Sequence, residues 1–125
     1  MILGTGIDLV EVERIASSFA RFGERFARRF LRPEELGYCL SHKDPAKHIA
    51  ARFAAKEAVS KAFGTGIGPA LGWHDIEVVR KPSGEPCIVM HGAGEKLLAQ
   101  HGAKRLHLSL THTAAHAAAV AILEG

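Results

Sequence analysis

The chain has few of the residues that mark disulfide scaffolds, metal-binding proteins and membrane proteins. It contains only two cysteines, Cys39 and Cys87, and their separation matches no metal-binding pattern. No apolar run approaches the roughly 18 residues that a membrane-spanning helix needs. The first residues also lack the basic start and the long apolar stretch of a signal peptide. We therefore expect a cytoplasmic protein with reduced thiols and no association with membranes.

Aromatic residues are scarce as well, at 6% of the chain, and they are not interleaved with basic residues. A surface on which nucleic-acid bases stack needs such interleaving. The 16 lysines and arginines exceed the 13 acids only slightly, which gives a net charge of +3. This mild excess favours an acidic protein or a phosphorylated ligand as the partner, and it argues against a nucleic acid.

The pattern of apolar residues predicts one domain that covers residues 1–125, because this length suits a single hydrophobic core. Periodicity and turn signals predict strands at 2–9, 73–80, 87–90, 106–111 and 117–123, and helices at 10–22, 24–31, 33–40, 45–63 and 92–101. Consecutive hairpins favour an antiparallel sheet. The predicted fold is therefore α+β, a mainly antiparallel sheet with helices packed on it.

Asp8 stands between the first strand and the first helix, and it has two possible roles. It could cap the helix, with Glu11 three residues later completing a capping box. It could instead be a metal ligand, because a carboxylate at the end of a strand can face a cleft. Both roles stay open from the residues alone.

Glu57 and Lys61 are four residues apart on the long helix and form either a solvated ion pair or part of a site. On a helical wheel they lie beside Ala50 and Ala54, so their face carries small residues and leaves room for a ligand or another backbone. A carboxylate beside an ammonium suits a magnesium-bound phosphate. The acid would hold the metal, and the lysine would neutralise phosphate oxygens.

The glycine-rich segment 64–68, which includes Gly64 and Gly66, follows this helix. Phosphate-binding loops of the Walker and Rossmann types precede a helix, so both are excluded. A loop of this kind is either a plain connection or a flexible segment whose backbone approaches a ligand closely.

Four arginines, Arg14, Arg21, Arg25 and Arg28, would lie within about 60° of one another on a continuous helix. They form either a solvated basic face or a docking strip for an acidic helix. A kink at Gly23 would turn the last two away from the first two.

His112 continues the alternating face of the strand at 106–111, and His116 follows it with the same parity. A zinc pair would need a third ligand, and none has a fixed spacing. The remaining readings for His112 are a hydrogen-bonded histidine at a strand end, a phosphate-binding residue or a proton relay.

Three segments in this order resemble the holo-[acyl-carrier-protein] synthase family, the small 4′-phosphopantetheinyl transferases. They are Gly6-Ile7-Asp8-Leu9-Val10-Glu11-Val12-Glu13-Arg14-Ile15, Phe53-Ala54-Ala55-Lys56-Glu57-Ala58-Val59-Ser60-Lys61-Ala62, and Leu108-Ser109-Leu110-Thr111-His112-Thr113. The resemblance covers essentially the whole chain. Thr111 and Thr113 stand where relatives often have serine or another small polar residue, and Ser83 stands where they often have asparagine.

The resemblance implies transfer of phosphopantetheine from coenzyme A to a serine of apo-acyl carrier protein, with release of adenosine 3′,5′-bisphosphate. It implies that Asp8 and Glu57 hold Mg²⁺ and that Lys61 contacts the coenzyme A phosphates. It also implies that His112 is an active-site residue that contacts coenzyme A near its nucleotide. The proton acceptor for the serine is then either Glu57, acting through a water molecule, or His112.

The same resemblance implies the surroundings of the site. The loop with Gly64 and Gly66 and the turn with Ser83, Gly84 and Pro86 would flank coenzyme A. The basic face with Arg14, Arg21, Arg25 and Arg28 would dock the acidic carrier protein. A homotrimer is implied, with its active sites at the subunit interfaces.

Two rival functions use the same residues. A small basic module could bind RNA or an acidic protein without catalysis, and a magnesium-dependent phosphohydrolase could use water as its nucleophile. Dependence on a carrier protein separates the transferase from the hydrolase, and dependence on a metal separates both enzymes from the module.

Overall fold

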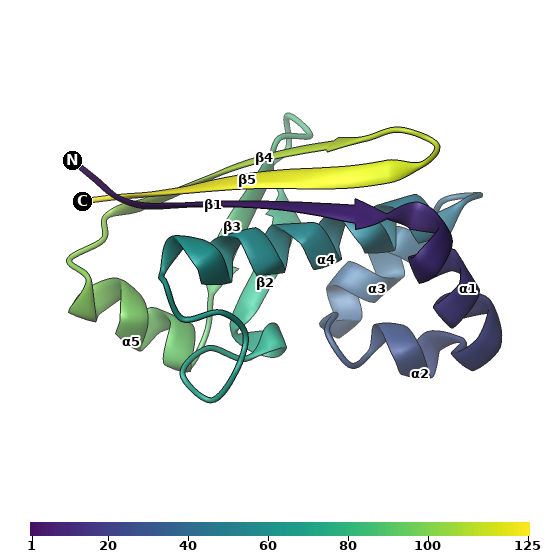
Figure 1. Cartoon of the computed structure of the whole chain (residues 1–125), viewed down its shortest axis with the longest axis horizontal. Helices are drawn as coiled ribbons and strands as arrows, with labels where there is room; N and C mark the ends of the chain where they lie inside the picture. Colours follow the sequence, from purple (N-terminus) through teal and green to yellow (C-terminus); the bar gives the residue numbers. More distant parts are fainter.

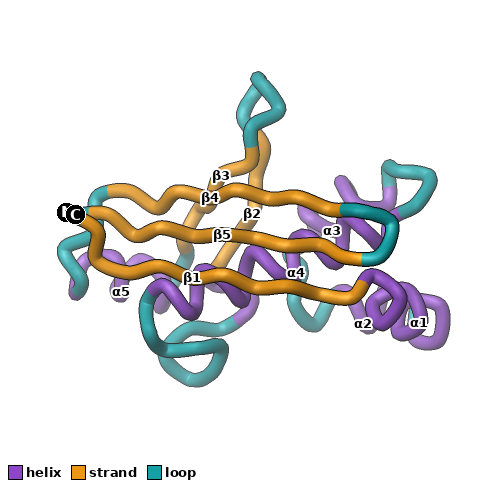
Figure 2. The backbone as a smooth tube through the Cα atoms, turned by 45° about the horizontal axis from the view of Figure 1, so that its top comes forward, coloured by secondary structure: helices purple, strands orange, loops and turns teal.

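A long helix, α4 (Pro45–Ala62), lies against a three-stranded antiparallel sheet in the computed structural model, which describes residues 1–125. The sheet has the order β1 (Ile2–Glu11), β5 (His116–Glu124), β4 (Arg105–His112). Every helix lies on the same side of this sheet, and its other face carries no helix (Figures 1 and 2). The predicted α+β class is confirmed.

Glycines in β1 allow the strand and α4 to touch backbone to backbone. A Cβ atom on Gly4 would lie 1.9 Å from the carbonyl oxygen of Ala62, and one on Gly6 would lie 1.8 Å from that of Ala58. Only a residue without a side chain fits at such a distance. The small-residue character of α4 therefore makes room for another backbone, and this contact fixes β1 relative to the helix.

The other elements lie at the two ends of α4. At one end are α1 (Val12–Phe22), α2 (Glu24–Ala27) and α3 (Pro33–Leu40), and at the other end is α5 (Ala93–Gln100). A 3-10 turn, η1 (Trp73–Asp75), leads into the hairpin of β2 (Ile76–Arg80) and β3 (Pro86–Met90). This hairpin crosses behind the main sheet, and its turn projects beyond the sheet's edge (Figure 2). No helix of the structure is long and apolar enough to cross a membrane.

The predicted elements are present, with differences at several ends. The first strand runs to Glu11 because its pairing with β5 continues as far as His116, so Asp8 lies inside the strand opposite Ala119. Glu11 is the N-cap residue of α1 and makes no side-chain cap. The helix-capping role considered for Asp8 is therefore wrong.

Two further predicted ends also shift. The strand predicted from Trp73 begins only at Ile76, because Asp75 accepts a hydrogen bond from the Gly72 amide at 2.8 Å and closes a turn there. The helix predicted over 24–31 ends at Ala27.

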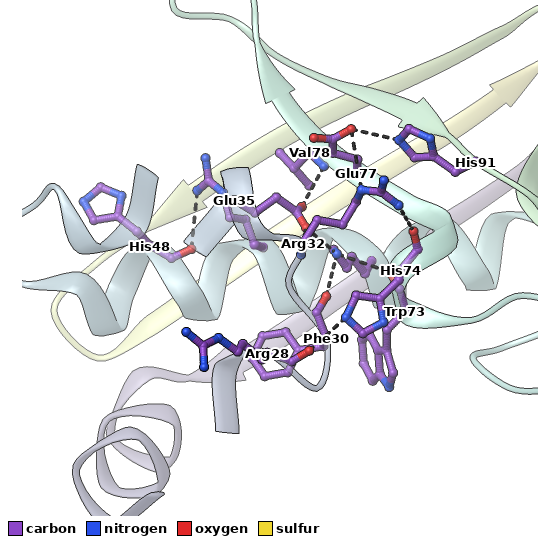
Figure 3. A network of polar contacts seen from close by, with 12 residues as sticks. Arg28, Phe30, Arg32, Glu35, His48, Trp73, His74, Glu77, Val78 and His91 are labelled. Atoms are coloured by element: carbon purple, nitrogen blue, oxygen red, sulfur yellow. Dashed lines mark hydrogen bonds and ion pairs between the residues drawn. The ribbon is translucent and has the colours of Figure 1, made fainter. Parts of the chain in front are cut away.

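A buried ion pair joins α3 and α4 beneath the main sheet. Lys56 and Glu35 have fully buried side chains, and the Lys56 ammonium donates to Oε1 of Glu35 at 2.7 Å and to the carbonyl oxygens of Phe30 and Trp73. Oε2 of Glu35 accepts a hydrogen bond from the Val78 amide at 2.8 Å (Figure 3). Because a buried pair is stable only when its hydrogen bonds are satisfied, these contacts fix the rotation of α4 about its axis.

Candidate active site

Asp8, Glu57 and Lys61 line one cavity of about 530 Å³, although the first belongs to β1 and the other two to α4. The close contact between Gly6 and α4 explains why the three side chains lie in one cavity. Asp8 follows Gly6 by two residues on the same face of the strand, and Glu57 and Lys61 flank Ala58 in the sequence of the helix. The structure thus brings together the two acids and the lysine that the sequence singled out.

Lys61 neutralises one of the two acids. Its ammonium donates to Oδ1 of Asp8 at 3.2 Å and to the carbonyl oxygen of Ile7 at 2.9 Å. The Asp8 side chain is 16% exposed and that of Lys61 is 50% exposed. The pair therefore lies at the rim of the cavity, where solvent and a ligand can reach it.

The negative charge of Asp8 affects the protonation of Glu57. Burial raises the pKa of Glu57, the Asp8 carboxylate raises it further, and Lys61 acts in the opposite direction. Two carboxylates that repel each other across a cavity are stabilised by a divalent cation. Their hard oxygen donors suit Mg²⁺, which takes one or two carboxylates and completes its shell with water and ligand oxygens. The residues present therefore fit magnesium.

His116, and not His112, lines this cavity. The sequence suggested His116 only as a zinc partner, because its place opposite Glu11 in the sheet depends on a register that the chain alone does not reveal. The structure contains no group of three or more His, Cys, Asp or Glu residues placed to hold a metal ion.

His112 lies instead in a histidine cluster at the end of β4. Its ring centre is 5.6 Å from that of His48, which lies 3.8 Å from that of His42. Burial lowers the pKa of His48 to about 4, and the neighbouring histidines and basic side chains lower it in the same direction. Within one chain, His112 is therefore separate from Asp8 and Glu57.

The glycine loop and the hairpin turn also lie outside the cavity. Gly64 and Gly66 have φ values of 78° and 64°, and a side chain on either would meet nothing within 4 Å. Gly84, with a φ of 90°, forms the turn between Ser83 and Pro86 at the tip of the β2–β3 hairpin. Both segments are open to solvent and can accept a ligand or a neighbouring molecule.

Gly23 separates the four arginines. Its φ of 65° and ψ of −150° end α1, so α2 starts in a new direction. Arg14 lines the Asp8 cavity, and Arg25 lines an adjoining hollow of about 300 Å³. Arg28 pairs with Glu24 at 2.9 Å and faces a different hollow. The arginines therefore do not form one continuous strip.

The adjoining hollow contains residues that the sequence did not single out. Arg29 and Ser18 are polar residues that line it, and Phe22 and Phe26 are its apolar lining residues. Ser18 and Phe26 also line the Asp8 cavity, so the two spaces are neighbours. The change of direction at Gly23 lies between Ser18 and Arg29, and a helical wheel of a continuous helix does not show that both line one hollow.

Comparison with known proteins identifies the family. The profile of the 4′-phosphopantetheinyl transferase superfamily matches residues 4–121. A holo-[acyl-carrier-protein] synthase of Koribacter versatilis is 52% identical over 124 residues, covering 99% of each chain. One of Nitratidesulfovibrio vulgaris is 48% identical with the same coverage. The chain belongs to this superfamily.

Solved structures agree with this phosphopantetheinyl transferase fold. The holo-[acyl-carrier-protein] synthase of Neisseria meningitidis superimposes with a TM-score of 0.92 at 37% identity, covering 100% of both chains. That of Helicobacter pylori, solved in complex with coenzyme A, gives 0.85 at 36% identity and covers 96% of this chain and 99% of its own. The resemblance stated from three sequence segments is therefore confirmed.

Proposed function

We propose that this single domain transfers 4′-phosphopantetheine from coenzyme A to a serine of apo-acyl carrier protein and releases adenosine 3′,5′-bisphosphate. The main support for the proposal is that Asp8, Glu57 and Lys61 line one cavity. The names of the relatives support the same reaction, since they are holo-[acyl-carrier-protein] synthases and one structure contains coenzyme A. We also propose the cytoplasm as its compartment, where the free thiols of Cys39 and Cys87 would stay reduced.

Asp8 and Glu57 would hold a magnesium ion, which supplies charge neutralisation for the diphosphate of coenzyme A. Lys61 would add a positive charge on a phosphate oxygen. The serine proton needs an acceptor, and we favour Glu57 over His112. Glu57 lines the cavity beside Asp8 and has a raised pKa, so it can accept the proton through a water molecule. His112 of a neighbouring copy is the competing candidate.

The acidic carrier protein would dock beside this cavity. Arg14 stands at the cavity and Arg25 in the adjoining hollow, whose surface also includes Phe22 and Phe26. A hollow lined by both arginines and phenylalanines suits a helix that carries acids beside an apolar side chain. Arg21, whose guanidinium lies 5.1 Å from the centre of the Phe22 ring, would extend this surface. Arg28 faces another hollow and would contribute less.

The helix-free face of the main sheet supports the homotrimer. Ile7 and Leu9 are 65% and 67% exposed there, and Val120 of the neighbouring strand β5 is 37% exposed. An apolar sheet face of this kind is a typical interface between subunits. Two groups implied as coenzyme A contacts, His112 and the 83–86 turn, do not line the cavity of their own chain. A neighbouring copy would bring such groups to the cavity.

The trimer is tested by mass in solution. Ile7→Lys places a charge in the proposed interface and should shift the light-scattering mass toward that of one chain. Val89→Lys alters a residue on the other sheet that is 40% exposed, and it should leave the mass unchanged. A trimeric mass for Ile7→Lys would contradict this interface.

The reaction is tested by mass spectrometry of an apo-acyl carrier protein incubated with the chain, coenzyme A and magnesium. A phosphopantetheine adduct is expected, and Asp8→Asn should abolish it without unfolding the chain. Asp44→Asn is the matched control, because Asp44 is an exposed acid with no cap hydrogen bond. Cleavage of coenzyme A without a carrier would favour the hydrolase, and metal-independent binding without an adduct would favour the binding module.

A further inference from the structure

The ammonium of Lys61 lies on Asp8, one of the two proposed metal ligands. Its two acceptors, Oδ1 of Asp8 and the carbonyl oxygen of Ile7, are 3.2 Å and 2.9 Å away. Both belong to β1, so the lysine bridges from α4 to the strand at the point where Asp8 faces the cavity. The ammonium of Lys61 is therefore already paired with the Asp8 carboxylate that a metal ion would bind.

The second acid has no such partner. Glu57 lines the same cavity, but its carboxylate forms no ion pair. A divalent cation bound by both acids would share Asp8 with the ammonium of Lys61, and two positive charges on one carboxylate repel each other. The lysine side chain is 50% exposed and can move into solvent without disturbing buried contacts.

We propose that Lys61 is the resident counter-ion of Asp8, and that a divalent cation displaces its ammonium from this carboxylate when it binds. This inference rests on the proposed metal site at Asp8 and Glu57, and it adds a competition between lysine and metal. The displaced ammonium becomes free to meet a phosphate group. One side chain thus stabilises the site before the metal arrives and contributes to ligand binding afterwards.

Metal binding without coenzyme A or carrier protein tests the competition. The free Mn²⁺ signal in electron paramagnetic resonance gives the Mn²⁺ affinity of the full chain and its variants. Lys61→Met removes the charge and keeps the length, so it should bind Mn²⁺ about tenfold more tightly than the unaltered chain, the effect of one nearby charge on a carboxylate. Lys61→Arg keeps the charge and should bind like the unaltered chain.

Lys81→Met is the matched control, since Lys81 forms an exposed ion pair with Glu85 at 3.4 Å on the other hairpin. It should leave Mn²⁺ affinity unchanged. A Lys81→Met variant that tightens Mn²⁺ binding as much as Lys61→Met would overturn the competition, because the effect would then not depend on an ammonium at Asp8.

The outcomes separate this inference from the metal site itself. Equal or weaker Mn²⁺ binding by Lys61→Met, with binding lost in Asp8→Asn, would overturn the competition and leave the metal site intact. Binding that is the same in Asp8→Asn as in the unaltered chain would overturn the metal site and the competition together. Tighter binding by Lys61→Met, lost in the double variant with Asp8→Asn, supports both.

Discussion

The contact between Gly6 and α4 predicts that one added methyl group will damage both stability and the site. In Gly6→Ala the new Cβ would lie 1.8 Å from the carbonyl oxygen of Ala58 and 2.9 Å from the amide nitrogen of Ala62, whereas ordinary contact begins at 3.4 Å. The atoms it meets belong to the backbone of a buried helix and cannot rotate away. The strand must therefore move outward by more than an ångström.

This movement of the strand determines how much the free energy of unfolding decreases. Overpacking of a buried site costs about 1–3 kcal/mol and sometimes more. Because the whole strand must shift against the helix, we expect the upper end, at least about 3 kcal/mol of the free energy of unfolding. For a chain of this length each kcal/mol corresponds to about 4 °C, so the melting temperature should fall by more than about 10 °C.

Urea unfolding followed by circular dichroism, at one fixed protein concentration, measures the change. Gly37→Ala is the matched control, since Gly37 lies in α3 and a Cβ there would meet nothing within 4 Å. That variant should be unchanged or more stable by roughly 0.5–1 kcal/mol, because alanine suits a helix better than glycine.

The outward shift would also carry Asp8 away from Glu57. Gly6→Ala should therefore lose Mn²⁺ affinity even below its melting temperature. A Gly6→Ala variant within 1 kcal/mol of the unaltered chain, with normal Mn²⁺ binding, would refute the argument that this contact positions the site.

Three further predictions concern charged groups. Lys56→Met leaves Glu35 buried without its partner and should lower the free energy of unfolding by about 3–5 kcal/mol in urea titrations; a loss below 1 kcal/mol would contradict the role of this pair. The pKa of His48 is about 4 in the folded chain and about 6.5 in the unfolded chain. Between these pH values only the unfolded chain binds the proton, so the free energy of unfolding falls as the pH drops from about 6.5 to about 4. After solvent screening the loss should be on the order of 1 kcal/mol, and His48→Gln should remove that part of the pH dependence. The raised pKa of Glu57 has the opposite sign, because the folded state holds the proton longer and loses stability as the pH rises through that pKa. Glu57→Gln should therefore raise the melting temperature of the metal-free chain at neutral pH and abolish the further rise caused by magnesium, and a lower melting temperature would contradict the repulsion from Asp8.

The long helix and its two cavity-lining residues could be predicted because the signals are local. Pro45 marks the start of α4, and the wheel places Glu57 and Lys61 on its small-residue face. The alternating strands and the hairpin with Gly84 also follow from short-range patterns. These features depend on neighbours along the chain, which the sequence displays directly.

The features that could not be predicted depend on long-range pairing. The sequence allows Asp8 to be a helix cap, and only the pairing of β1 with β5 shows that the strand continues past it. His116 enters the cavity only through the register of the same pair of strands. Arg29 lines the same hollow as Arg25 after the chain changes direction at Gly23, and no helical wheel of a continuous helix shows this change. In each case the deciding contact lies far away in the sequence or depends on one backbone torsion.

Lys56 and Glu57 are consecutive on α4, yet Lys56 reaches the buried Glu35 and Glu57 lines the cavity, and this limits how the protein can change its length. A residue inserted just before position 56 would rotate everything after it by about 100° around the axis of α4. The ammonium would leave its buried carboxylate, and the two cavity residues of the helix would turn away from Asp8. Variation by insertion or deletion should therefore be confined to segments such as the hairpin turn, while α4 changes only by substitution.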